Sequence, residues 1–192
     1  MKKILCALLA LVCIFSVVSC ADKSLSAFNS AAAETAPSKV EIYVEQTTVY
    51  GPLVLDVDVV YAEDGSATIT GTRDVLNTIE SGAIGDVVSS VPVNVTCDAN
   101  GNYSDGGAFS GNTAVATGVT FNFTKDAMTY EVSSDGNILN ATIAADKTEA
   151  TLGVKIDAEV ALTLIMSEGK IVSYTMKYTI ADTPVYINCV YS

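Results

Sequence analysis

The chain has 192 residues, and its 10 basic and 22 acidic residues give a formal net charge of −12. This acidity argues against a nucleic-acid partner, because binding to a phosphate backbone needs a basic surface. The sequence has no histidine, which removes Ser-His and Cys-His nucleophile pairs and the commonest zinc ligand. We therefore predict no metal or cofactor and expect the chain not to be an enzyme, although a site built from carboxylates alone stays open.

The first 20 residues have the pattern of an export signal. Met1-Lys2-Lys3 is positively charged, and the apolar run from Ile4 to Val18 is too short to span a bilayer comfortably. The run ends in Val17-Val18-Ser19-Cys20. This ending resembles the lipobox of bacterial lipoproteins: an aliphatic residue, a variable residue, a small residue and then cysteine. The resemblance implies cleavage after Ser19 and a diacylglyceryl group on the Cys20 thiol.

Lipidation of Cys20 would anchor the protein to a membrane without spanning it. Each buried methylene contributes about 0.8 kcal/mol, and two or more acyl chains give stable attachment where one chain does not. We therefore expect the membrane to be a partner through Cys20. The expected location is the cell envelope, on the periplasmic or extracellular face.

The segment after Cys20 is rich in Ala and Ser and is typical of a flexible tether. Leu25, Phe28 and Ala32 lie at near-helical spacing within it, so a short helix is the alternative. From Lys39 onward the pattern is that of one domain. The predicted organisation is a signal peptide at 1–19, a tether at 20–38 and a single β domain at 39–192.

The body of the chain has the period-two pattern of β-strands. Val40, Ile42 and Val44 alternate with polar residues, as expected for strands with one wet face. Pairs ending in glycine separate several such runs and predict hairpin turns. These pairs are Asp64-Gly65, Asn100-Gly101, Asp135-Gly136 and Glu168-Gly169.

The predicted fold is therefore all-β, with room for a short helix. We expect ten to twelve antiparallel strands in a meander of hairpins, forming either a half-barrel or a sandwich. Residues 103–109 are among the expected strands. Residues 74–90 do not fit the pattern, because Gly82 and Gly85 interrupt the apolar residues. We interpret this segment as an irregular excursion, either a short helix or a flap over the sheet.

Aromatic residues concentrate late in the chain. As core residues they fill volume, and on a concave surface they could hold an apolar ligand, with methionine adding adaptability. Both alternatives stay open from the sequence. The candidate ligand-binding residues are Phe121, Phe123, Tyr174, Met176 and Tyr178.

Two cysteines, Cys97 and Cys189, lie in the body of the chain. In an exported protein they could form a disulfide, and the alternative is two small buried hydrophobic side chains. The sequence alone gives no distance between them.

Two acidic motifs suggest chemistry only weakly. Asp98 to Asp105 resembles the first half of a calcium loop, but Phe109 stands where the bidentate glutamate belongs, so a hairpin turn is favoured. Asp56 and Asp58 share one strand face and could form an acid/base pair. We expect them to face water, since Leu55, Val57 and Val59 take the other face.

The order of elements also resembles the lipid-carrier half-barrels of the LolA/LppX kind. The residues that carry this resemblance are the Ser167–Ile171 turn and the following Tyr174-Thr175-Met176-Lys177-Tyr178. The resemblance implies an apolar cavity that carries acyl chains. We therefore predict a membrane-anchored lipoprotein whose β domain binds an apolar ligand, such as a lipid, or an envelope component. The alternative is a surface-displayed structural or adhesive β-sandwich.

Overall fold

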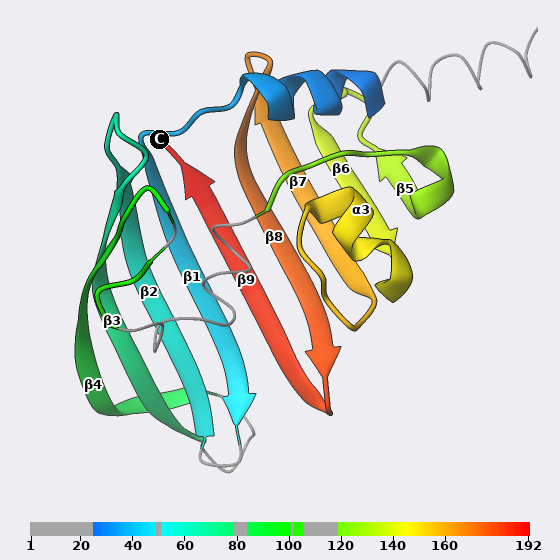
Figure 1. Cartoon of the computed structure of the whole chain (residues 1–192). Helices are drawn as coiled ribbons and strands as arrows, with labels where there is room; N and C mark the ends of the chain where they lie inside the picture. The colour runs from blue at the N-terminus through cyan, green and yellow to red at the C-terminus, as the bar shows by residue number, and fades with distance from the viewer. Residues whose placement is uncertain (1–24, 49–50, 79–83, 101, 106–118) are drawn as a thin grey trace, which may run out of the picture.

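The computed structural model describes residues 25–48, 51–78, 84–100, 102–105 and 119–192 of the chain (Figure 1). The lipobox and Cys20 lie outside these residues. The described strands form one antiparallel sheet of nine strands. They are β1 (Lys39–Thr48), β2 (Gly51–Tyr61), β3 (Ala67–Thr78), β4 (Ile84–Cys97), β5 (Met128–Val132), β6 (Ile138–Ile143), β7 (Val160–Ser167), β8 (Lys170–Ile180) and β9 (Thr183–Tyr191).

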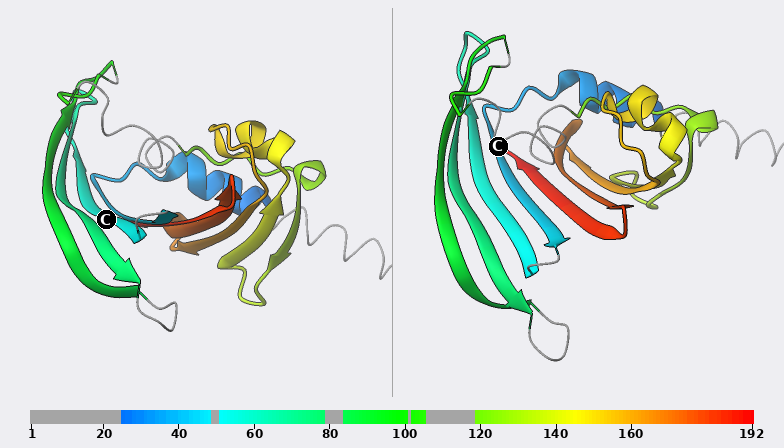
Figure 2. Two further views of the ribbon diagram at one scale, coloured as in Figure 1. Left: turned by 90° about the horizontal axis from the view of Figure 1, so that it is seen from below. Right: turned by 60° about the horizontal axis from the view of Figure 1, so that its bottom comes forward.

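The sheet is built from two meanders that meet at its centre. The strand order is β4-β3-β2-β1-β9-β8-β7-β6-β5, so the first and last strands of the chain lie side by side. Figure 2 shows that the sheet curls into an open trough with one concave face. The predicted all-β half-barrel is confirmed, and a single sheet replaces the sandwich that was the alternative.

The concave face carries the hydrophobic core. Ile42 of β1 lies opposite Val57 and Cys189, and Cys189 lies opposite Tyr174. All four side chains are at most 2% exposed. Because successive residues of a strand point to opposite faces, the intervening polar residues lie on the convex face. The strands β1, β2, β8 and β9 at the centre of the sheet therefore each supply an apolar row to the trough.

The predicted turns connect the strands. Gly65 and Gly136 lie in the β2–β3 and β5–β6 turns with positive φ angles. In the β7–β8 turn, Glu168 and Gly169 have φ angles of 52° and 76°, the pattern of a two-residue turn that matches the strand twist. Gly101 lies outside the described residues.

The prediction of an irregular excursion at residues 74–90 is wrong for the parts that the structure describes. Val75 of β3 lies opposite Ser89, and Leu76 lies opposite Val87 of β4, with a register shift between these pairs. A β-bulge thus absorbs one extra residue, and strand pairing continues past the irregular pattern. Of the strand expected at 103–109, the structure shows an isolated bridge from Tyr103 to Cys97, and residues 106–109 are not described.

Residues 25–34 are helical and belong to the core. Leu25, Phe28 and Ala31 are 4%, 0% and 1% exposed, which is the spacing of one helix face. The predicted flexible tether is therefore wrong for residues 25–34, and the alternative short helix is the one found. Figures 1 and 2 show this helix lying within the trough, across β7 and β8.

A second group of short elements covers the same half of the trough. The 3-10 helices η1 (Lys125–Ala127) and η2 (Ala145–Lys147) flank β5 and β6, and α3 (Thr148–Leu152) follows η2. The buried Thr148 hydroxyl contacts Ile156 by two hydrogen bonds, one accepted from its N–H and one donated to its C=O. These elements and helix 25–34 fill the β6–β8 half of the concave face (Figure 2).

Gly71 of β3 has no room for a side chain. A Cβ there would meet the Asp56 carbonyl oxygen and lie 2.7 Å from the Val57 Cα, and the φ angle is +155°. We expect Gly71→Ala to destabilise the fold by more than about 2 kcal/mol, because backbone atoms of β2 would have to move. Urea unfolding followed by circular dichroism measures this loss.

Gly136→Ala is the matched control. Its φ angle is +76°, but nothing lies within 4 Å of the added Cβ. We expect only the left-handed backbone cost of about 1–2 kcal/mol. Equal losses in the two variants would show that contact with β2 does not constrain position 71.

Candidate functional site

Helix 25–34 is held in the trough by a pair of hydrogen bonds between Asn29 and Phe123. The Asn29 side chain donates from Nδ2 to the Phe123 carbonyl oxygen (3.0 Å) and accepts from the Phe123 N–H at Oδ1 (2.7 Å). An asparagine side chain thereby pairs with both backbone groups of Phe123, as a neighbouring strand would. The helix and the segment 119–124 are consequently fixed to one another.

The C-terminal end of the helix is attached to β8. The Thr35 hydroxyl donates to the Ala31 carbonyl oxygen (2.7 Å) and accepts from the Ile171 N–H (2.9 Å). The second bond joins residues that are 136 positions apart in the sequence. Helix 25–34 is thus attached at two points, to Phe123 through Asn29 and to Ile171 of β8 through Thr35.

A cavity of about 510 Å³ lies beside this helix, at the end of the sheet where β2 and β9 finish. The helix contributes small residues to the lining, and the sheet contributes apolar and aromatic residues. Segment 119–121 forms a third part of the lining. Its volume falls in the range of small-molecule sites. The lining residues are Asn29, Ala32, Ala33, Thr35, Pro37, Val40, Tyr61, Val119, Thr120, Phe121, Ile171 and Tyr191.

Two rings that line this cavity, Phe121 and Tyr191, belong to an aromatic cluster. The Phe121 ring lies 5.3 Å from the Tyr174 ring, edge to face, and stacks on Phe123 at 5.5 Å. Tyr174 in turn contacts Tyr191 edge to face at 6.0 Å. Such contacts add to the energy of burial and hold the rings in defined orientations. Phe121 and Tyr191 are therefore both packed against the buried Tyr174 ring.

The cavity is electrically neutral. None of the described lining residues is Lys, Arg, Asp or Glu. Burial raises the pKa of the Tyr61 and Tyr191 hydroxyls above the usual tyrosine range, with the neighbouring Cys189 adding to the effect. Both phenols therefore stay protonated at neutral pH. The site offers apolar surface and a few neutral hydrogen-bonding groups.

The structure separates the five aromatic and methionine residues that the sequence singled out. Phe121 lines the cavity. Tyr174, Met176 and Phe123 are at most 3% exposed and pack in the core. Tyr178 is also buried and lies against a different hollow at the opposite end of the sheet.

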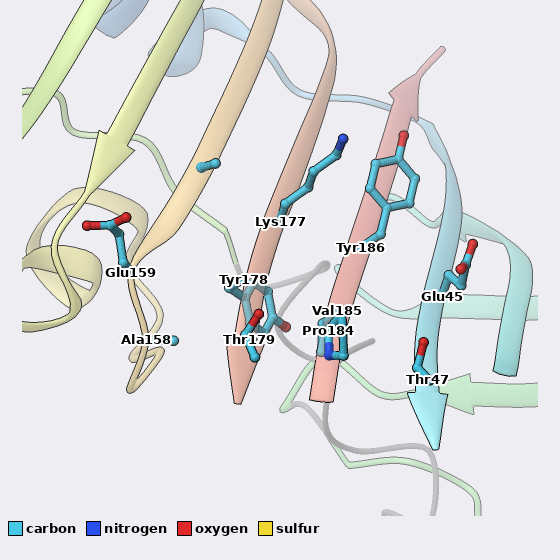
Figure 3. A pocket seen from close by; sticks show the side chains of 11 residues that line it. Glu45, Thr47, Ala158, Glu159, Lys177, Tyr178, Thr179, Pro184, Val185 and Tyr186 are labelled. Carbon is cyan, nitrogen blue, oxygen red and sulfur yellow. The ribbon is translucent and has the colours of Figure 1, made fainter. Parts of the chain in front are cut away.

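That second hollow has a volume of about 470 Å³ and a mixed lining (Figure 3). Glu45, Glu159 and Lys177 contribute charge, and the Lys177 ammonium lies 5.4 Å from the centre of the Tyr186 ring. Figure 3 shows Lys177, Tyr186 and Glu45 on neighbouring strands. Because of these charges, the hollow suits an apolar ligand less well than the cavity beside helix 25–34.

Sequence reasoning missed most of the cavity. Asn29 and Thr35 lie in the segment expected to be a tether, and Tyr61 ends a strand without any motif. The helical spacing of Leu25, Phe28 and Ala32 was the one available signal. It indicated a helix, but a spacing does not say what the helix covers.

Cys97 and Cys189 are both free thiols. They lie on β4 and β9, which are separated by β3, β2 and β1 in the sheet. Cys189 is fully buried, and burial raises its pKa to about 12. It therefore behaves as the small buried hydrophobic side chain that was the alternative to a disulfide.

The acidic motifs are structural in the described residues. The Asp98 carboxylate accepts hydrogen bonds from the Asn102 side-chain amide and from the Asn102 and Asn100 N–H groups. These bonds make a turn, and they lower the pKa of Asp98, the Asn102 side chain having the largest effect. Asp56 is exposed, and Asp58 pairs with Lys39 at 3.1 Å. Across the described part of the chain, no group of three or more acidic or cysteine side chains could hold a metal ion.

No protein-family model and no curated protein matches the chain. Among solved structures, the chain is similar to the crystal structure of LprF from Mycobacterium bovis, with a TM-score of 0.44 and 14% sequence identity. The alignment covers 88% of this chain and 91% of that chain. A likeness of this size establishes neither a family nor a function. None of the helices in the described ranges has the length and apolar character needed to cross a bilayer.

Replacing Asn29 tests how the helix is held. Asn29→Ala leaves the N–H and C=O of Phe123 without their partner, so we expect a loss of about 2 kcal/mol in the free energy of unfolding. Hydrogen exchange should speed up in residues 25–34 more than in β8. The exposed neighbour Ser30→Ala is the control, and an equal effect from it would contradict the docking role of Asn29.

Proposed function

We propose that this chain is a lipoprotein anchored to an envelope membrane through Cys20, and that its half-barrel binds an apolar ligand in the cavity beside helix 25–34. The observation that carries the proposal is the cavity of about 510 Å³, whose described lining is uncharged and includes the rings of Tyr61, Phe121 and Tyr191. A ligand with an uncharged, apolar body gains the most from such a lining. Binding and carrying, rather than catalysis, is the activity proposed.

The lining supports this proposal over a catalytic one. The polar groups around the cavity are amides and hydroxyls, and Asn29 and Thr35 already use theirs to hold the helix. Among the lining residues that the structure describes, there is no carboxylate to act as a general base and no cysteine nucleophile. What remains is shape and apolar surface, which can hold a ligand but cannot activate it.

A second candidate function rests on strand β4. This 14-residue strand is the last in the described sheet order, so one of its edges has no partner strand there. Val87, Val88 and Val91 on it are 54%, 67% and 45% exposed. A long edge with exposed apolar residues is a template for pairing with another chain. This observation favours an adhesive or structural role as the alternative.

Filling the cavity tests ligand binding. Ala32 lines the cavity and is only partly buried, so we expect Ala32→Trp to occupy the ligand space and to weaken binding at least about tenfold. The measurement is the fluorescence of N-phenyl-1-naphthylamine bound to the chain from residue 21 onward, which contains every described residue. Mass spectrometry of an organic extract should also show less co-purified lipid.

Ala27→Trp is the control, because Ala27 is exposed on the same helix and does not line the cavity. It should leave probe binding unchanged. A wild-type chain that neither binds the probe nor co-purifies lipid would overturn the carrier proposal and favour the role of the β4 edge.

The anchor is tested separately. In cells fed labelled palmitate, the full chain should incorporate label, and Cys20→Ala should abolish it, because no thiol then takes the diacylglyceryl group. Ser24→Ala, four residues away, should leave labelling intact. Label that persists in the Cys20→Ala chain would show that this residue is not the site of lipidation.

A further inference from the structure

The sole arginine of the chain, Arg73, lies on the concave face of the sheet. In β3 it follows Ile69 and Gly71 at intervals of two residues, and it lies directly opposite Leu55 of β2 and Val91 of β4. Ile69 and Leu55 are buried core residues. Because alternate residues share a face, Arg73 points to the same side as the core.

The surroundings of Arg73 are apolar. Its neighbours across the strands are Leu55 and Val91, and its same-face neighbours along β3 are Gly71 and Val75. Val91 is 45% exposed, so apolar surface beside Arg73 is open. A cation among such neighbours is unusual, because polar side chains of a one-sided sheet normally face water on the other side.

Arg73 also has no ion-pair partner among the residues that the structure describes. It is exposed. The next residue, Asp74, faces the convex side, where its carboxylate accepts hydrogen bonds from the Thr72 and Ser90 hydroxyls. The charge of Asp74 is therefore directed away from the trough. In a chain with a net charge of −12, a guanidinium on the apolar face with no ion-pair partner among the described residues is a specific point of attraction for an anion.

We propose that the concave face of β3 and β4 binds a long-chain fatty acid, with its carboxylate on the Arg73 guanidinium and its acyl chain on the exposed Val91 and the half-buried Val75 and Val93 beside it. A guanidinium is planar and can donate two parallel hydrogen bonds to the two oxygens of one carboxylate. Val75, Val91 and Val93 on the same face supply apolar contacts. This surface is separate from the cavity beside helix 25–34, so the inference does not rest on the proposed function.

The chemistry favours a carboxylate over a larger anionic head group. Arg73 supplies one positive charge, and its direct neighbours on the face offer no further hydrogen-bond donor from their side chains. A phosphodiester linked to glycerol would bring additional polar groups that need partners there. A single carboxylate can accept both hydrogen bonds of the Arg73 guanidinium. The rest of the fatty acid is then an acyl chain that contacts the valines.

Photo-crosslinking in membranes tests this site on the full chain. The protein is placed in phosphatidylcholine nanodiscs containing palmitic acid with a diazirine on its acyl chain, and the labelled peptides are identified by mass spectrometry. We expect label in residues 67–97. The uncharged methyl ester of the same probe should label these residues about tenfold less, because it cannot form the charge-assisted pair.

Variants separate charge from position. Arg73→Gln should reduce labelling by the acid about tenfold and leave labelling by the ester unchanged, while Arg73→Lys should retain part of the labelling. Lys177→Gln removes the same charge from a strand position facing the convex side, between Met176 and Tyr178 of the core face, and should change nothing. Circular dichroism confirms that each variant is folded.

The outcomes distinguish this inference from the proposed function. Equal labelling of residues 67–97 by acid and ester, or no effect of Arg73→Gln, would overturn the role of Arg73. Stronger labelling by a diazirine lysophosphatidic acid would overturn the carboxylate assignment. Label confined to peptides around Ala32 and Phe121 would overturn this site and leave the cavity proposal standing.

Discussion

The pairing of β1 with β9 is the interaction on which the rest of the structure depends. Seven residue pairs, from Val40–Tyr191 to Gln46–Val185, join the two meanders into one sheet, and Lys39 and Ser192 exchange two backbone hydrogen bonds of 3.0 Å. These contacts close a loop of nearly the whole described chain, which is a large entropic cost in folding. Only when they form do the apolar rows of the two halves become one concave core.

The described strands form a single curled sheet, so its apolar concave face must be covered by helices and loops. Helix 25–34 does this for the β6–β8 half, with Leu25 and Phe28 as its buried face and Asn29 and Thr35 as its polar attachments. The helix covers this half and is hydrogen-bonded to segment 119–124. Beside the helix a cavity remains, whose described lining residues are uncharged. The cavity is thus a product of how the core is closed, and ligand binding would use the space that packing leaves.

Local rules predicted the elements that local forces determine. Alternation gave the strands around Ile42 and Val57, and the positive φ demanded at Gly65, Gly136 and Gly169 gave the turns. Residues 74–78 and 84–90 were misjudged because pairing along β3 and β4 outweighed the weak local preference of a glycine-rich segment. The cavity could not be foreseen, because Asn29 and Tyr61 acquire their roles only through contacts with distant residues.

The position of helix 25–34 in the fold also determines how far the domain can move from its proposed anchor. Five peptide steps separate Cys20 from Leu25, and a fully extended chain of that length spans at most about 18 Å. If Cys20 is lipidated, the docked helix would keep the domain within about that distance of the bilayer surface. Ligand transfer between the trough and the membrane would then need no long excursion through water.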